Sequence, residues 1–212
     1  MADLRYDNAA SLLQACGREG SLAGSDLSYL DLRGINLSGL DLSSATLTGS
    51  NLSGATLSHC NLTDLFVQDS QWQGCKLNHV NLSNATLQRV NLNQSEWQRC
   101  QLSGSSLLIC DLDASIFTAC DLAGCRLLEC SFEKSQFNHC DLNHTQWRSS
   151  ILTASHFNHC SFNQADLRKT NLTAARYTQI SAVEALYYGK APWNGCEAEG
   201  NWREMLHTFD GE

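Results

Sequence analysis

The stretch FNHCDLNHTQW at residues 137–147 is followed, twenty residues later, by the similar FNHCSFNQADL at residues 157–167. In the first stretch a large apolar residue recurs at every fifth position, at Phe137, Leu142 and Trp147. A step of five matches neither the 3.6-residue period of a helix nor the 2.0-residue period of a strand. The stretch therefore indicates an internal repeat, and such a repeat decides the fold of the whole chain.

The five-residue step continues from Leu22 to Tyr177 without insertion or deletion. Within this range every position whose number ends in 2 or 7 holds Leu, Val, Phe, Tyr or Trp, and we call this position i. Position i−2 holds mostly small or slim residues, such as Ala45, Cys60 and Ser70, and position i−1 is often Asp or Asn. Large and slim residues thus alternate in a strict register.

This register predicts an all-β solenoid. Positions i−2 and i lie on the same side of a short extended segment, because alternate side chains of a strand point the same way. A bend in each five-residue unit would give a four-sided coil of about twenty residues, with both positions filling the lumen. Successive coils would stack about 4.8 Å apart with paired backbone groups.

The pattern A(D/N)LXX appears here as CNLTD, VNLSN, CDLAG and ADLRK, and it resembles the repeat of the pentapeptide-repeat family. The resemblance covers residues 20–180. It implies a right-handed quadrilateral β-helix of about eight coils, which would be a rod about 38 Å long.

Neighbouring His and Cys residues do not predict a metal site in this register. His139 would face solvent and Cys140 the lumen, so the two could not bind one ion in tetrahedral geometry. All cysteines except Cys16 and Cys196 lie at i−2, where thiols act as small hydrophobes. We expect them to be free and inert, and we predict no metal, cofactor or catalytic residue.

Two further columns follow from a twenty-residue coil. The inward column contains aromatic residues in its C-terminal half and predicts stacked rings: Trp97, Phe117, Phe137, Phe157 and Tyr177. An outward column contains His59, His79, His139 and His159. These imidazoles would form either a pH-sensitive stripe or, as we favour, a solvated face that accepts any polar residue.

Solenoids must cap both ends. Residues 1–19 are predicted to form an N-terminal helical cap, because NAASLLQAC at 8–16 has helical spacing after Asn8. Residues 181–212 form a C-terminal segment, in which SAVEALYYGK suggests a further short helix. Trp193 and Trp202 in this segment would either cover the last coil or form a hot spot for a partner or a homodimer.

The bulk composition limits the partners. The net charge of −8 argues against binding of nucleic acid or anionic membranes. The chain shows neither a secretory signal nor an apolar run long enough to span a bilayer, so we expect a cytoplasmic protein. A filled lumen leaves no pocket for a catalytic set, which argues against an enzyme.

Two classes of function remain, both based on protein binding. The first is a rigid scaffold that binds a protein through its outer faces and C-terminal segment, including roles as a bacterial secretion-system accessory or effector. The second, implied by the resemblance, is a DNA mimic that binds DNA gyrase or topoisomerase IV, a type II topoisomerase, and protects against quinolones or toxins. Residues 20–180 carry 13 acidic and 10 basic residues, a weak likeness to DNA. Two acidic clusters support this second interpretation: Asp111 with Asp113, and Glu129 with Glu133.

Overall fold

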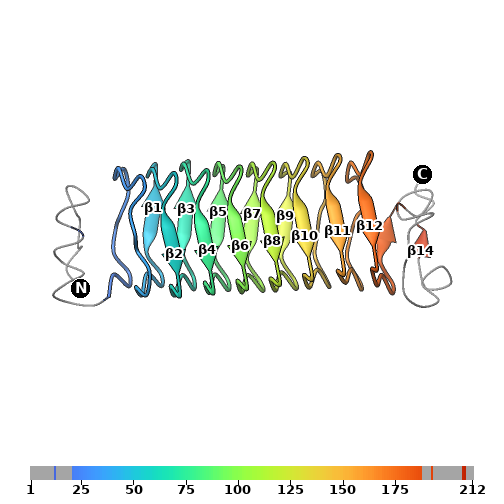
Figure 1. The fold of residues 1–212 in the computed structure, drawn as a ribbon, viewed down its shortest axis with the longest axis horizontal. Coiled ribbons are helices and arrows are strands. Elements are labelled where there is room, and N and C mark those ends of the chain that lie inside the picture. Colours follow the sequence, from blue (N-terminus) through green and yellow to red (C-terminus); the bar gives the residue numbers. More distant parts are fainter. Residues whose placement is uncertain (1–11, 13–20, 188–191, 193–206, 209–212) are drawn as a thin grey trace.

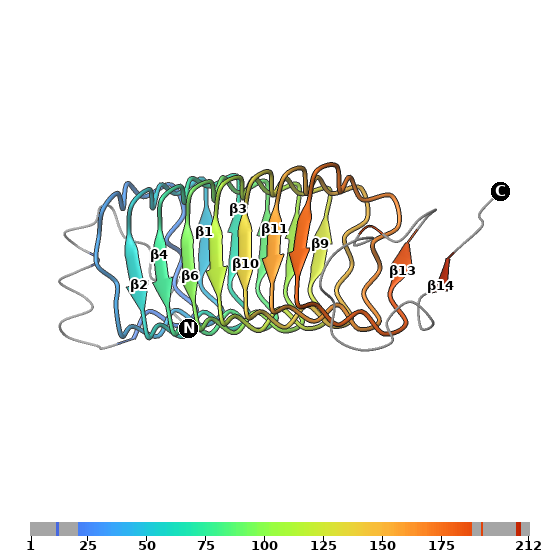
Figure 2. The same ribbon diagram turned by 45° about the vertical axis from the view of Figure 1, so that its right-hand side comes forward.

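A single rod dominates the structure. The computed structural model describes residues 12, 21–187, 192 and 207–208. In residues 21–187 the chain coils repeatedly around one long axis, with each coil stacked on the last (Figure 1). A second view shows the same regular stacking from another side of the rod (Figure 2).

The strands of the rod are short and pair only in parallel. Among the described residues, sheets form in the orders β1-β3-β5-β7-β9, β12-β11-β10-β8-β6-β4-β2 and β13-β14. Partner residues of neighbouring coils lie twenty positions apart, as Phe137 pairs with Phe117 and Phe157. The strands have these bounds: β1 Thr46–Thr48, β2 Thr56–Ser58, β3 Phe66–Gln68, β4 Lys76–Asn78, β5 Thr86–Gln88, β6 Glu96–Gln98, β7 Ser106–Leu108, β8 Ile116–Thr118, β9 Arg126–Leu128, β10 Gln136–Asn138, β11 His156–Asn158, β12 Arg176–Thr178, β13 Leu186–Tyr187 and β14 His207–Thr208.

The rod has four faces, which we number in the order in which the chain passes through them. Face 1 carries β1, β3, β5, β7 and β9. Face 3 carries β2, β4, β6, β8, β10, β11 and β12. Isolated parallel bridges join the coils on face 2, as between Asp31 and Asn51, and on face 4, as between Asp41 and Asn61. Pairing on all four sides confirms the predicted quadrilateral solenoid.

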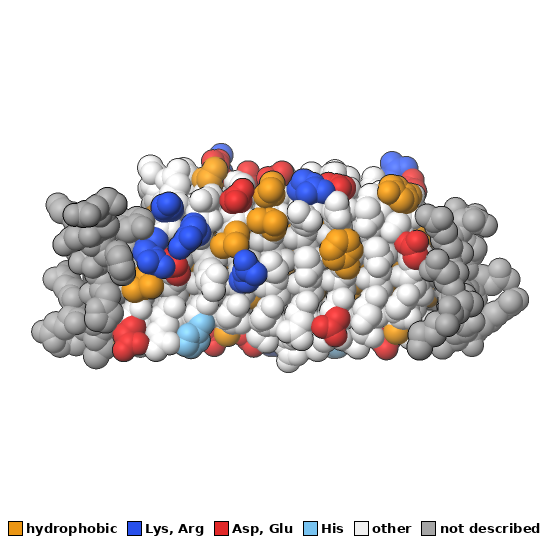
Figure 3. Space-filling model, turned by 180° about the vertical axis from the view of Figure 1, so that it is seen from behind, with side chains coloured by type: hydrophobic (Ala, Val, Ile, Leu, Met, Phe, Trp, Pro, Cys, Tyr) orange, Lys and Arg blue, Asp and Glu red, His pale blue; other side chains and the backbone are white. Residues whose placement is uncertain are grey.

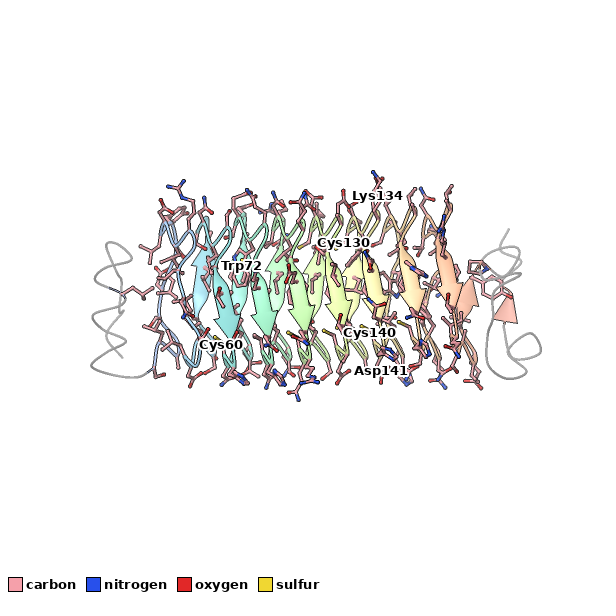
Figure 4. All side chains as sticks on the ribbon, viewed as in Figure 1. Cys60, Trp72, Cys130, Lys134, Cys140 and Asp141 are labelled. Carbon is pink, nitrogen blue, oxygen red and sulfur yellow. The ribbon has the colours of Figure 1, made fainter. Side chains whose placement is uncertain are left out.

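The lumen is filled by the predicted inward register. From Leu22 to Tyr177 the side chains at position i are buried, except that Leu172 is only partly buried. Figure 4 shows Trp72 inside the rod and Lys134 on its outer edge. The predicted aromatic stack is confirmed: the ring of Phe137 lies 4.7 Å from that of Phe117 and 4.9 Å from that of Phe157, between centroids.

Hydroxyl and thiol groups at i−2 join neighbouring coils. Cys75 Sγ donates to the carbonyl oxygen of Leu52 at 3.0 Å, and Ser150 Oγ donates to that of Leu127 at 2.6 Å. Both acceptors belong to the preceding coil. A slim donor therefore suits this position because it fits the lumen and satisfies a buried carbonyl. The cysteines at i−2 are free and buried, as predicted.

Side chains at i−1 shape the corners. In Asn81 and Asp121, for example, Oδ1 accepts a hydrogen bond from the backbone N–H two residues later, at 3.0 and 2.9 Å. Such Asx turns bend the chain locally. Asp and Asn are frequent at this position because their short side chains reach that N–H.

One expectation about the C-terminal end is wrong. Residues 181–187 do not form a helix but continue the coil, since Ala182 lies inward in the register and β13 begins at Leu186. The small Ala182 at position i concealed this continuation. β14 then pairs with β13, which covers the edge of face 1. The rest of the predicted helix and the N-terminal cap lie outside the described residues, except Leu12, which is buried in the core.

Candidate interaction surface

Any site for a ligand or partner must lie on the outer surface, because the lumen is filled. In residues 21–187, positions i−1, i+1 and i+2 point outward and supply most of that surface. Within residues 21–187, no three His, Cys, Asp or Glu side chains gather into a metal-binding group. No helix in the described ranges has the length and apolar character needed to cross a bilayer.

Charge is unevenly distributed among the four faces. Within the described residues, face 4 contains carboxylates and no Lys or Arg, and Asp141 marks this lower side of the rod in Figure 4. Faces 1 and 3 carry most of the basic side chains. The acidic residues of face 4 are Asp41, Asp64, Asp121, Asp141 and Glu184.

The structure brings the four predicted acidic residues together. Asp111 and Asp113 flank the inward Leu112 on face 2, and Glu133 lies one coil beyond Asp113 in the same column. Glu129 occupies the corner between faces 1 and 2 in that next coil. The other two predicted residues, Trp193 and Trp202, lie outside the described residues.

One of these carboxylates is engaged in holding the coils together. Asp113 Oδ1 accepts hydrogen bonds from Ser131 Oγ at 2.6 Å and from the backbone N–H of Glu133 at 2.8 Å. The N–H of Asp113 in turn donates to Asn93 Oδ1 at 2.7 Å. Asp113 is therefore a structural residue first, and Asp111, Glu129 and Glu133 supply the accessible negative charge.

Apolar side chains lie directly beside this acidic cluster. Leu108 and Leu128 are paired residues of β7 and β9, and both point outward and remain half-buried. Ile109 occupies the adjoining corner with 46% of its surface exposed. Seen from behind, the rod has hydrophobic side chains gathered near its middle, with basic side chains toward the C-terminal end (Figure 3). We call this surface the apolar–acidic corner. It consists of three apolar residues, Leu108, Ile109 and Leu128, and four acidic residues, Asp111, Asp113, Glu129 and Glu133.

The sequence analysis named the acidic residues of this corner as two separate clusters, and it did not name the apolar residues. The signal was present, since Leu108, Ile109 and Leu128 occupy outward positions i+1 and i+2, where polar residues predominate. A search of the outward registers for large apolar residues would have identified them. Apolar side chains at neighbouring outward positions make this corner a candidate interaction surface.

The predicted histidine column also forms. His59 and His79 stack with ring centroids 4.9 Å apart, and His139 and His159 stack at 4.6 Å. His139 is exposed and Cys140 is buried, which confirms that they lie on opposite sides of one wall. Whether the column senses pH stays a hypothesis.

Comparisons with known proteins agree with this architecture. The family model "Pentapeptide repeat region" matches residues 90–167, and the model "Pentapeptide repeats (8 copies)" matches residues 21–64. No curated protein is significantly similar to the chain in sequence.

The solved structure of HetL shows the same fold. HetL of the cyanobacterium Nostoc sp. strain PCC 7120, a pentapeptide repeat protein involved in heterocyst differentiation regulation, has a TM-score of 0.75 at 18% identity, covering 91% of each chain. QnrB1, a plasmid-mediated fluoroquinolone resistance protein, has a TM-score of 0.44 at 13% identity, covering 86% of this chain and 87% of its own. The repeat register, the four-sided coil and the two family models lead to one conclusion. The chain belongs to the pentapeptide-repeat family.

Proposed function

We propose that the protein is a rigid scaffold that binds a protein partner through its apolar–acidic corner. The observation that supports this proposal is the placement of Leu108, Ile109 and Leu128 at outward positions beside a cluster of carboxylates. Burial of three aliphatic side chains would supply affinity, at about 25 cal/mol per Å² of apolar surface. The carboxylates would supply selectivity for a partner with basic side chains around an apolar centre.

The mechanical properties of the rod suit this role. Backbone hydrogen bonds join each coil to the next on all four faces, and the filled lumen prevents the walls from collapsing. A surface built on such a framework is already ordered before it binds. Association therefore costs little conformational entropy at the rod, which favours affinity.

Affinity purification with variants tests the proposal. Full-length protein carrying Leu108→Ser, Ile109→Asn and Leu128→Ser is compared with the wild type as bait, and recovered proteins are quantified by mass spectrometry. The recovered amount of a specific partner should fall by about tenfold or more, since removal of a hot spot costs about 1–2 kcal/mol of binding free energy or more. Phe66→Ser is the matched control, because Phe66 is an exposed apolar residue of face 1 in β3, outside the corner.

The control decides the outcome. The proposal is supported if the corner variant loses the partner and the Phe66→Ser variant still recovers it. Equal recovery by the corner variant and the wild type contradicts it, provided that both proteins show the same circular dichroism spectrum.

A second candidate function rests on face 4. Within residues 21–187, no Lys or Arg shares this face with its carboxylates, and imitation of DNA requires negative charge that is not balanced in this way. In this case the partner would be a type II topoisomerase. The test is a gyrase supercoiling assay, with and without quinolone, using the wild type and a variant with Asp→Asn changes at Asp41, Asp64, Asp121 and Asp141.

Asn preserves the Asx turns in this variant while removing the charge. An effect of the wild type that disappears in the neutralised variant would support imitation of DNA. No effect of the wild type at a large molar excess would eliminate it.

A further inference from the structure

A second surface feature lies on the opposite edge of face 2 from the apolar–acidic corner. It is a groove of about 340 Å³ at the corner between faces 2 and 3. Lys134, which borders it, stands on the upper outer edge of the rod in Figure 4. The groove is lined by Lys134, Gln136, Ala154, His156, Ala174 and Arg176.

The repeat explains why a groove opens here. Ala154 and Ala174 occupy the corner position in two successive coils, where their methyl groups leave the surface open. Two residues after the corner position, three successive coils carry Gln136, His156 and Arg176. Neighbouring coils lie about 4.8 Å apart. Three coils thus direct polar side chains around a floor of two alanines.

Within residues 21–187, no carboxylate neutralises the positive charge of the groove. Lys134 and Arg176 make no ion pair or side-chain hydrogen bond with the part of the chain that the structure describes. Other arginines of the rod do have partners: Arg33 pairs with Asp31 at 2.6 Å and Arg89 with Asp69 at 2.6 Å. Uncompensated cations around a concave surface favour an anionic ligand.

We propose that this groove binds a dianionic oxyanion of the phosphate monoester class. The anion would lie over Ala154 beside His156, with Lys134 reaching it from the preceding coil and Arg176 from the following coil. Arg presents a planar fork of donors that matches a phosphate, and Lys adds a point charge. The imidazole and the Gln136 amide each provide a further donor.

The limits of the positive patch set the size of the ligand. In the column that contains Arg176, the residues before Gln136 are Ile116 and Glu96, which offer no favourable contact to a phosphate. Glu133, on face 2 next to Lys134, adds negative charge on the other side. The site therefore fits one phosphate group and not a nucleic-acid backbone, which needs a continuous row of cations.

Isothermal titration calorimetry of the full-length protein tests this inference. The probes are inorganic phosphate, a peptide containing phosphoserine and the same peptide without phosphate. We expect binding of the first two probes only. Lys134→Gln combined with Arg176→Gln should weaken binding by about tenfold or more, since both charge-assisted contacts to the phosphate are lost.

Two controls make the result decisive. Lys76→Gln removes a cation from the same column outside the groove and should leave binding unchanged. Ala154→Asp should abolish binding, and Ala154→Asn should weaken it less. Asp and Asn both tolerate the φ of 55° at this position, but only Asp adds a negative charge.

Comparison of the two phosphate-containing probes identifies the source of the anion. Tighter binding of the phosphopeptide than of phosphate would identify a modified protein as the source of the anion, and equal binding would identify free phosphate. Absence of phosphate binding by the wild type would overturn the inference, as would equal loss in the Lys76→Gln variant. Neither result would affect the proposed scaffold function, because that function uses a different corner.

Discussion

At each corner of the rod, the residue at position i+2 adopts a left-handed backbone conformation. From Gly24 to Glu184 these residues have φ between 48° and 79°. Gly, Asn and Asp accept this conformation most easily, whereas a β-branched side chain is strained there. Ile109 is such a case, with φ of 54°, and strained residues that persist often serve function.

Relief of this strain is predicted to stabilise the protein. Ile109→Asn should raise the free energy of unfolding by about 1 kcal/mol, because Asn tolerates the left-handed region. Chemical denaturation followed by circular dichroism measures the change. Gly124→Ile is the reverse control: open space surrounds Gly124 at φ of 69°, so only backbone strain should destabilise this variant. An unchanged stability of both variants would contradict the argument.

The Asx turn is the second device at the residue scale. Asn81 Oδ1 accepts hydrogen bonds from the backbone N–H of Ser83 at 3.0 Å and from its Oγ at 2.7 Å. Asn81→Ala should therefore lower the free energy of unfolding by about 1 kcal/mol. Gln101 occupies the same position one coil later and is exposed, so Gln101→Ala should change stability by less than about 0.5 kcal/mol. Equal losses for the two variants would refute a special role of the turn.

At the scale of the element, each strand is too short to be stable alone and depends on its neighbours in the adjacent coils. β10 illustrates this dependence, because its three residues pair with β8 on one side and β11 on the other. Its inward residue, Phe137, stacks in the aromatic column and also meets Trp147 edge-on at 6.0 Å. Stability thus comes from contacts between coils, as in other solenoids.

Removal of one ring should weaken several coils together. Phe137→Ala is expected to lower the free energy of unfolding by about 3–5 kcal/mol, through lost transfer energy and the cavity left behind. Phe66 on β3 is 37% exposed, so Phe66→Ala should cost less than about 0.5 kcal/mol. Guanidinium denaturation of the two variants measures both values. A cost below about 1 kcal/mol for Phe137→Ala would show that the stack is not a main source of stability.

At the scale of the whole molecule, the rod is a wall of stacked coils around a lumen filled by buried side chains. The thiols inside it are shielded, and burial raises the pKa of Cys75 to about 12 and that of Cys125 to about 12. A thiol reacts through its thiolate, so both exclusion from solvent and the raised pKa suppress reaction. The fold thereby protects residues that would be reactive on a surface.

Labelling should report the integrity of the rod. In the native protein at pH 8, N-ethylmaleimide is expected to leave the nine cysteines at i−2 unmodified, and in guanidinium it should modify all nine. Mass spectrometry of peptides counts the modified residues. Fast modification of Cys75 or Cys125 in the native state would show that the wall opens readily.

The inward register, the four-sided coil and the aromatic column follow from the amino-acid sequence, because a strict five-residue period assigns each side chain to the lumen or to solvent. The two acidic clusters, Asp111 with Asp113 and Glu129 with Glu133, were also visible in the sequence. The contacts of the outer side chains became visible in the three-dimensional structure. It showed that Asp113 holds two coils together and that Arg89 is paired with Asp69. It also showed that Lys134 and Arg176 border a groove and have no ion-pair partner in the described part of the chain. The reason is physical: the inward positions are dictated by burial and repeat along one dimension, whereas outward contacts depend on side-chain conformations across stacked coils, which no period specifies.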